Sequence, residues 1–180
     1  MAENIEEEKY QTSEEFDHLS FGCLEEVSGY GIAKDMQEIG SKSSSSITNF
    51  ICGIIKDGED ISNDVLEHFQ CYGLPGDIVT QYIPKTLGGY DSGDNSFNLN
   101  PTANIKEWKA GLTKCYEHLK KDKKNIVRII YIIGYQKGEI RLCDIFYNFK
   151  LYSNNIQKSD ETVEGRFHNP VPKINHHEEI

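Results

Sequence analysis

Two short stretches carry residue types that bind metal ions. His68 and Cys71 are separated by two residues, and Cys115 and His118 repeat that spacing in reverse order. Imidazole nitrogen and thiolate sulfur are preferred ligands of Zn²⁺, and a closed structural site takes four ligands at one point. Nothing in the sequence forces these two stretches together in space. We therefore expect no bound metal or cofactor, and a zinc-binding module built on His68, Cys71, Cys115 and His118 is kept as an alternative.

The motifs of the common enzyme classes are missing from the sequence. It contains no G-x-S-x-G nucleophile elbow, no H-E-x-x-H zinc motif and no glycine-rich dinucleotide loop. The five cysteines lie far apart, and an odd number without close pairs predicts free thiols in a reducing compartment. A fold can still bring Cys115 or Cys143 next to a histidine, so a cysteine-dependent enzyme is a second alternative.

Charge is distributed unevenly along the 180 residues, whose formal net charge is -10. Residues 1–30 hold nine carboxylates and one lysine, whereas lysines gather in residues 106–124. The net negative charge opposes general binding to nucleic acid or to an anionic membrane, so neither partner is favoured. A lysine-rich face instead predicts an acidic protein partner. The predicted binding residues are Lys106, Lys109, Lys114, Lys120, Lys121, Lys123 and Lys124.

Helical spacing of apolar residues dominates the first half of the chain. Ser13 can cap a helix in which Phe16, Leu19, Cys23 and Val27 form one stripe. Similar spacing within residues 47–55 predicts a second helix, and a third begins at Ser62 or Asn63. A short fourth element precedes Pro84. Residues 13–83 are accordingly predicted to be helical.

The second half has a different pattern. Residues 84–102 are dense in Gly, Asn, Asp, Ser and Pro, which predicts a linker. Residues 105–121 form an amphipathic helix with lysines on its polar face. Residues 126–135 are apolar on both faces apart from Arg128, as in a central strand, and alternation in residues 139–152 completes a hairpin. The sequence thus predicts an α+β fold, with an N-terminal helical half followed by a helix and an antiparallel hairpin-based sheet.

This pattern also predicts the domain organisation. A single α+β domain spans residues 13–152, comprising the helical part 13–83, the linker 84–102 and the helix plus hairpin 103–152. Residues 1–12 are predicted to be a disordered acidic tail and residues 153–180 a flexible polar tail, because both are poor in apolar side chains. The longest apolar runs are too short to cross a membrane, so we expect a soluble protein in the cytoplasm or elsewhere inside the cell.

These observations together predict a non-enzymatic adaptor protein that binds other proteins. Its partner surface combines the lysine-rich helix, residues 105–121, with the exposed end of the hairpin, and the acidic N-terminal arm competes for the helix face. A small viral structural or accessory protein is the main alternative, since such proteins have this size and lack catalytic motifs. No pattern in the sequence specifies an oligomeric state.

Overall fold

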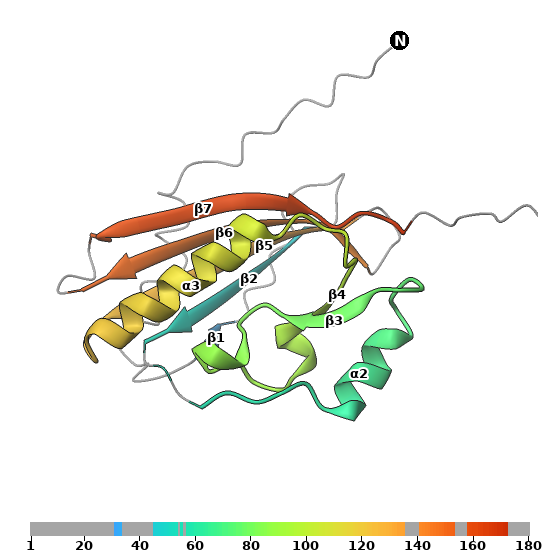
Figure 1. Ribbon diagram of the computed structural model, residues 1–180, viewed down its shortest axis with the longest axis horizontal. Coiled ribbons are helices and arrows are strands. Elements are labelled where there is room, and N and C mark those ends of the chain that lie inside the picture. Colours follow the sequence, from blue (N-terminus) through green and yellow to red (C-terminus); the bar gives the residue numbers. More distant parts are fainter. Residues whose placement is uncertain are drawn as a thin grey trace, which may run out of the picture.

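The computed structural model describes residues 31–33, 45–53, 55, 57–135, 141–153 and 158–172. Within these ranges the chain has an α+β fold with antiparallel sheets, as predicted (Figure 1). A five-stranded sheet has the order β1-β2-β5-β6-β7, and a second sheet pairs β3 with β4. The strands of the large sheet are β1 (Gly31–Ala33), β2 (Ser45–Cys52), β5 (Ile126–Tyr135), β6 (Leu142–Tyr152) and β7 (Glu161–His168). The remaining elements are α2 (Asn63–Gln70), β3 (Ile78–Gln81), the 3₁₀ turns η2 (Lys85–Leu87) and η3 (Gly93–Asn95), β4 (Ser96–Leu99) and α3 (Lys106–Lys121).

Strand β5 is the centre of the large sheet. It pairs antiparallel with β2 on one side and with β6 on the other, so the predicted central strand and its hairpin with β6 are both confirmed. Side chains on both faces of β5 are buried, which is why its sequence is apolar at nearly every position. The chain between β5 and β6, residues 136–140, lies outside the described residues.

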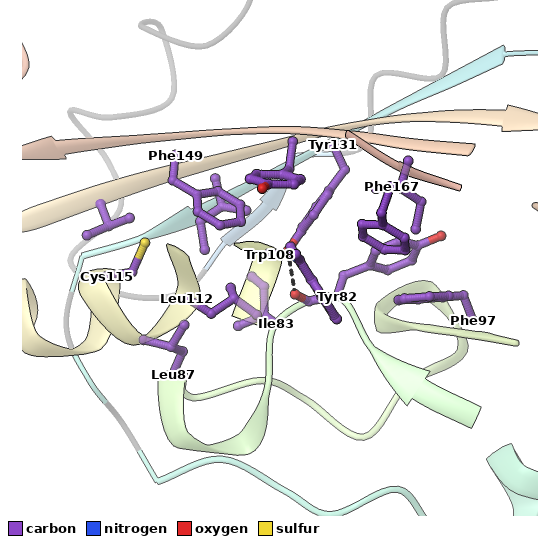
Figure 2. Close-up of a cluster of buried hydrophobic side chains, with 14 of the residues drawn as sticks. Tyr82, Ile83, Leu87, Phe97, Trp108, Leu112, Cys115, Tyr131, Phe149 and Phe167 are labelled. Carbon is purple, nitrogen blue, oxygen red and sulfur yellow. Dashed lines mark hydrogen bonds between the residues drawn. The ribbon is translucent and has the colours of Figure 1, made fainter. Parts of the chain in front are cut away.

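Helix α3 packs on one face of this sheet and forms the core with it, as Figure 1 shows. Its buried stripe contains Trp108, Leu112, Cys115 and Leu119, and the amphipathic helix predicted over residues 105–121 is confirmed. Gly111 lets the helix approach closely, because a Cβ there would lie 3.1 Å from side-chain atoms of both Phe149 and Val163. The sheet side of the core consists of alternate residues of β5 and β6 together with Phe167 of β7 (Figure 2).

The helical assignment of residues 13–83 is wrong in three described segments. Residues 31–33 form strand β1, residues 45–52 form strand β2, and residues 78–81 form strand β3. The apolar residues of 47–55 fit a helical period, but Ile, Thr and Phe also favour strands, and eight register pairs with β5 stabilise the extended form. Within the described part of residues 13–83, α2 is the one segment that is helical as predicted, and the Ser62 side chain caps it by accepting a hydrogen bond from the Val65 amide at 3.4 Å.

The predicted linker 84–102 is also ordered, forming η2, η3 and β4. Asn95 organises its turns, because its side chain bonds both backbone groups of Ile83 at 2.9 Å and the carbonyl of Tyr90 at 3.0 Å. The turn-forming residues therefore build tight turns against the core, where Leu87 and Asn95 are buried.

The predicted polar tail 153–180 contains strand β7, which pairs with β6 from Asp144 to Leu151. Val163 and Phe167 contribute to the core although the segment is mostly polar. The tail prediction is thus wrong for residues 161–168. Residues 1–12, 154–157 and 173–180 of the predicted tails lie outside the described residues, as does the predicted first helix over residues 13–27.

Candidate functional site

A groove of about 700 Å³ lies between α3 and strand β3. Its rim is open to solvent, since Asp60, Thr86, Lys109 and Thr113 are exposed. Helix α3 provides one wall, and strand β3 with the start of η2 provides the other. The lining residues are Asp60, Ile61, Val79, Thr80, Gln81, Pro84, Thr86, Trp108, Lys109, Leu112, Thr113 and Tyr116.

Strand β3 presents an edge along this groove. Among the described residues it pairs only with β4, in the register Thr80↔Phe97. The Tyr82 amide donates a hydrogen bond to the Asn95 carbonyl at 2.9 Å. This bond shows which alternate residues of β3 direct their backbone N–H and C=O groups toward β4 and which direct them away. In an antiparallel pair every second residue directs its N–H and C=O away from the partner. On β3 these are Val79 and Gln81, and both line the groove.

The α3 wall is aromatic and rigidly held. The Trp108 indole donates to the Tyr131 hydroxyl at 3.0 Å, and that hydroxyl donates to the Tyr82 carbonyl at 2.7 Å (Figure 2). Burial raises the pKa of both Tyr131 and Tyr82 well above the usual value, so the two hydroxyls stay neutral at physiological pH. This chain of bonds joins α3, β5 and the end of β3. The two walls of the groove therefore have a fixed separation.

The predicted binding lysines are all exposed on or just beyond α3. Lys109 lines the groove, and the Lys120 ammonium lies 5.1 Å from the ring centroid of Tyr116, another lining residue. Lys114 instead forms an ion pair of 2.7 Å with Glu161 of β7, and that hydrogen bond raises its pKa. Lys85 is likewise paired with Asp60 at 2.6 Å. The other predicted lysines, which have no described acidic partner, are Lys106, Lys121, Lys123 and Lys124.

The four candidate zinc ligands lie in two different environments. His68 and Cys71 are exposed on α2, and the Cys71 thiol donates to the Glu67 carbonyl at 3.4 Å. Cys115 and His118 are buried on α3, where the His118 Nε2 lies 3.0 Å from the Tyr152 carbonyl oxygen. Among the described residues, no group of three or more His, Cys, Asp or Glu side chains is arranged to hold a metal ion.

The two candidate nucleophiles are also held in structural positions. Cys115 is fully buried in the core. The Cys143 thiol donates to the Gly134 carbonyl at 3.3 Å, and burial raises its pKa, with Asp144 adding to the shift. A reactive cysteine requires the opposite, a lowered pKa that favours the thiolate. The one described histidine beside this group, His168, lies 3.3 Å from the Asp144 carboxylate.

The carboxylate of Asp144 forms a separate charged cluster on the sheet. Burial acts to raise its pKa, but hydrogen bonds from Arg166 and His168 outweigh that effect, and the pKa lies below its usual value. Arg166 donates to it at 3.0 Å. Asp144 therefore stays ionised at neutral pH and serves as the anchor of an ion pair.

Two sets of residues in this region were missed by sequence reasoning. The β3 wall of the groove was assigned to a helix, although Ile78, Val79 and Thr80 are β-branched and favour a strand. The second set is a buried ion pair between Asp77 and Arg141, which are 64 residues apart. No local pattern marks such a pair, because it exists only once the β3 turn meets the start of β6.

None of the helices in the described ranges has the length and apolar character that a membrane-spanning helix requires. Comparisons with protein-family models, with curated proteins and with solved structures find no match for this chain. The function proposed for it therefore rests on the groove, the β3 edge and the lysines around them.

Proposed function

We propose that this protein is a non-enzymatic binding protein, an adaptor, that takes an extended acidic segment of a partner protein into the groove between α3 and β3. The observation that carries the proposal is a strand edge with outward-facing backbone groups, at Val79 and Gln81, along a groove lined by both apolar and polar side chains. Extended peptides commonly bind by adding a strand to such an edge. The backbone then provides affinity and the adjoining side chains provide selectivity.

Lysines give the groove its preference for acidic segments. Lys109 lies in the lining, and Lys120 lies beside it on Tyr116. Lys121, Lys123 and Lys124 extend the positive surface beyond the end of the helix. Charges at the rim of an interface mainly steer association and select partners. An intracellular setting suits this role, because the described cysteines Cys71, Cys115 and Cys143 form no disulfide.

A proline at position 79 tests the strand-addition step. Val79→Pro removes an N–H that faces the groove, and proline is tolerated at such outward positions of edge strands. We expect its affinity for a fluorescein-labelled peptide of alternating glutamate and valine to fall about tenfold, since one backbone hydrogen bond is lost and the ring obstructs a second strand. The measurement is fluorescence anisotropy on the full chain.

Val79→Thr is the matched control, because it keeps the N–H and the β-branched shape. Its affinity should stay close to that of the unmodified chain. Equal affinities for the proline and threonine variants, with both folded by circular dichroism, would rule out strand addition at β3.

A further inference from the structure

The groove between α3 and β3 has charges of opposite sign on its two sides. Its charged lining residues are Lys109 on α3 and Asp60 in the segment before α2. Asp57 and Glu59, which are also exposed, add negative charge to that segment. Asp60 pairs with Lys85 at 2.6 Å, but its side chain is 81% exposed, so its carboxylate can accept a second cation.

The register of β3 shows which of its faces each side of the groove adjoins. Thr80 is directly opposite Phe97 of β4, a core residue whose ring centroid lies 6.2 Å from that of Trp108 on α3 (Figure 2). Thr80 therefore lies on the face of β3 that adjoins α3. The side chain of Gln81 lies on the other face, where its amide donates a hydrogen bond to the Glu59 carbonyl at 3.1 Å. That second face adjoins the segment before α2.

A strand added to the edge of β3 has the same alternation of side chains. Its residue opposite Thr80 directs its side chain toward α3 and therefore toward Lys109. Its residues opposite Val79 and Gln81 direct their side chains the other way, toward Asp60. Successive side chains of the bound segment thus meet charges of opposite sign.

We propose that the partner segment has two different faces, with acidic side chains at alternate positions and basic side chains at the positions between them. This inference rests on the strand addition proposed above and specifies its partner further. The acidic side chains face Lys109, and the basic side chains face Asp60. A continuous acidic run binds less well, because every second carboxylate then faces Asp60. The groove selects the order of the charges, so a segment with no net charge can bind.

Single charge reversals on the full chain test this assignment. The probe is a fluorescein-labelled peptide of alternating glutamate and lysine, and its affinity is measured by fluorescence anisotropy. Lys109→Glu and Asp60→Lys should each weaken binding about fivefold, because each turns one attraction into a repulsion. Glu67→Lys and Lys158→Glu make the same charge changes at exposed positions outside the groove lining, and they should leave the affinity unchanged.

The double variant Asp60→Lys/Lys109→Glu should bind the same peptide to within about twofold of the unmodified chain. A slip of one residue exchanges the two faces of an added strand, so the peptide can again match both charges. A peptide of alternating glutamate and glutamine is the matched control, because its second face is neutral. Lys109→Glu should weaken its binding, whereas Asp60→Lys should not.

Amide hydrogen exchange at Val79 and Gln81 distinguishes failure of this inference from failure of strand addition. If the glutamate–lysine peptide slows their exchange but neither single reversal weakens binding, strand addition stands and the two-faced partner is overturned. A double variant that binds no better than the single variants also overturns it. Binding of the glutamate–valine peptide without binding of the glutamate–lysine peptide has the same meaning. If neither peptide slows exchange at these amides, both proposals are wrong.

Discussion

Arg141→Met should lower the free energy of unfolding by about 3–5 kcal/mol, because it leaves the buried Asp77 carboxylate without its counter-ion. The guanidinium donates to both oxygens of Asp77, at 2.6 and 2.9 Å, and the two side chains are only 8% and 2% exposed. The same guanidinium also donates to the Pro170 carbonyl at 3.0 Å. One residue thus joins the β3 turn, the start of β6 and the chain after β7.

Urea unfolding followed by fluorescence of Trp108, the single tryptophan, measures this loss. Lys85→Met is the matched control. It removes an ion pair of the same length with Asp60, but there the two side chains are 52% and 81% exposed. Exposed pairs contribute at most about 1 kcal/mol. A loss from Arg141→Met no larger than that of the control would show that the buried pair does not hold these segments together.

Reversing the lysines at the end of α3 should slow binding of the acidic peptide by about tenfold or more at low salt. The variant changes Lys120, Lys121, Lys123 and Lys124 to glutamate, which converts an attractive rim into a repulsive one. The difference from the unmodified chain should narrow as salt rises, because exposed charges are screened over about 8–10 Å near 0.1–0.15 M. Stopped-flow fluorescence of the labelled peptide measures the association rate.

A control variant with the same change in net charge distinguishes repulsion of the peptide at the α3 surface from repulsion by the net charge of the whole chain. Four lysines outside α3 serve for it: Lys34, Lys42, Lys158 and Lys173. Reversing them should slow association much less. Deleting residues 1–12 should speed association if the acidic arm competes for the lysines, as the charge distribution of the sequence predicts. Equal slowing by the two reversed sets would mean that net charge, and not the α3 surface, governs binding.

Part of this fold follows from local sequence patterns. The β5 run is apolar on both faces, and the α3 stripe repeats at helical spacing over four turns, so each pattern fits one element only. The Ser62 cap identifies the start of α2 for a similar reason, because its hydroxyl bonds a backbone amide three residues ahead. Such signals are contained within one element.

Other elements depend on contacts that no local pattern records. The apolar residues of β2 fit a helix or a strand equally well, and pairing with β5 decides between them. Strand β7 alternates Val163, Gly165 and Phe167 with polar residues, but the segment is short and polar, and it becomes a strand by pairing with β6. Gly165 belongs to this contact, because a Cβ there would meet the Tyr147 ring and hydroxyl.

The candidate site likewise has one part that the sequence predicts and another part that it does not. The lysines of α3 could be named from composition, because a helix with one apolar stripe exposes its charged residues. The groove could not, since one wall is the β3 edge and the other is α3, and their separation is set by Trp108, Tyr131 and Tyr82 across three elements. A site formed between distant segments has no sequence spacing of its own.

The most direct test of strand addition is residue-resolved amide hydrogen exchange by NMR on the full chain, with and without the glutamate–valine peptide. The Val79 and Gln81 amides face the groove, and we expect their exchange to slow at least about tenfold on binding, because a second strand would accept their hydrogen bonds. The Thr80 amide faces β4 in the free protein and should change little. Unchanged exchange at Val79 and Gln81 in the peptide complex would contradict the proposed mode of binding.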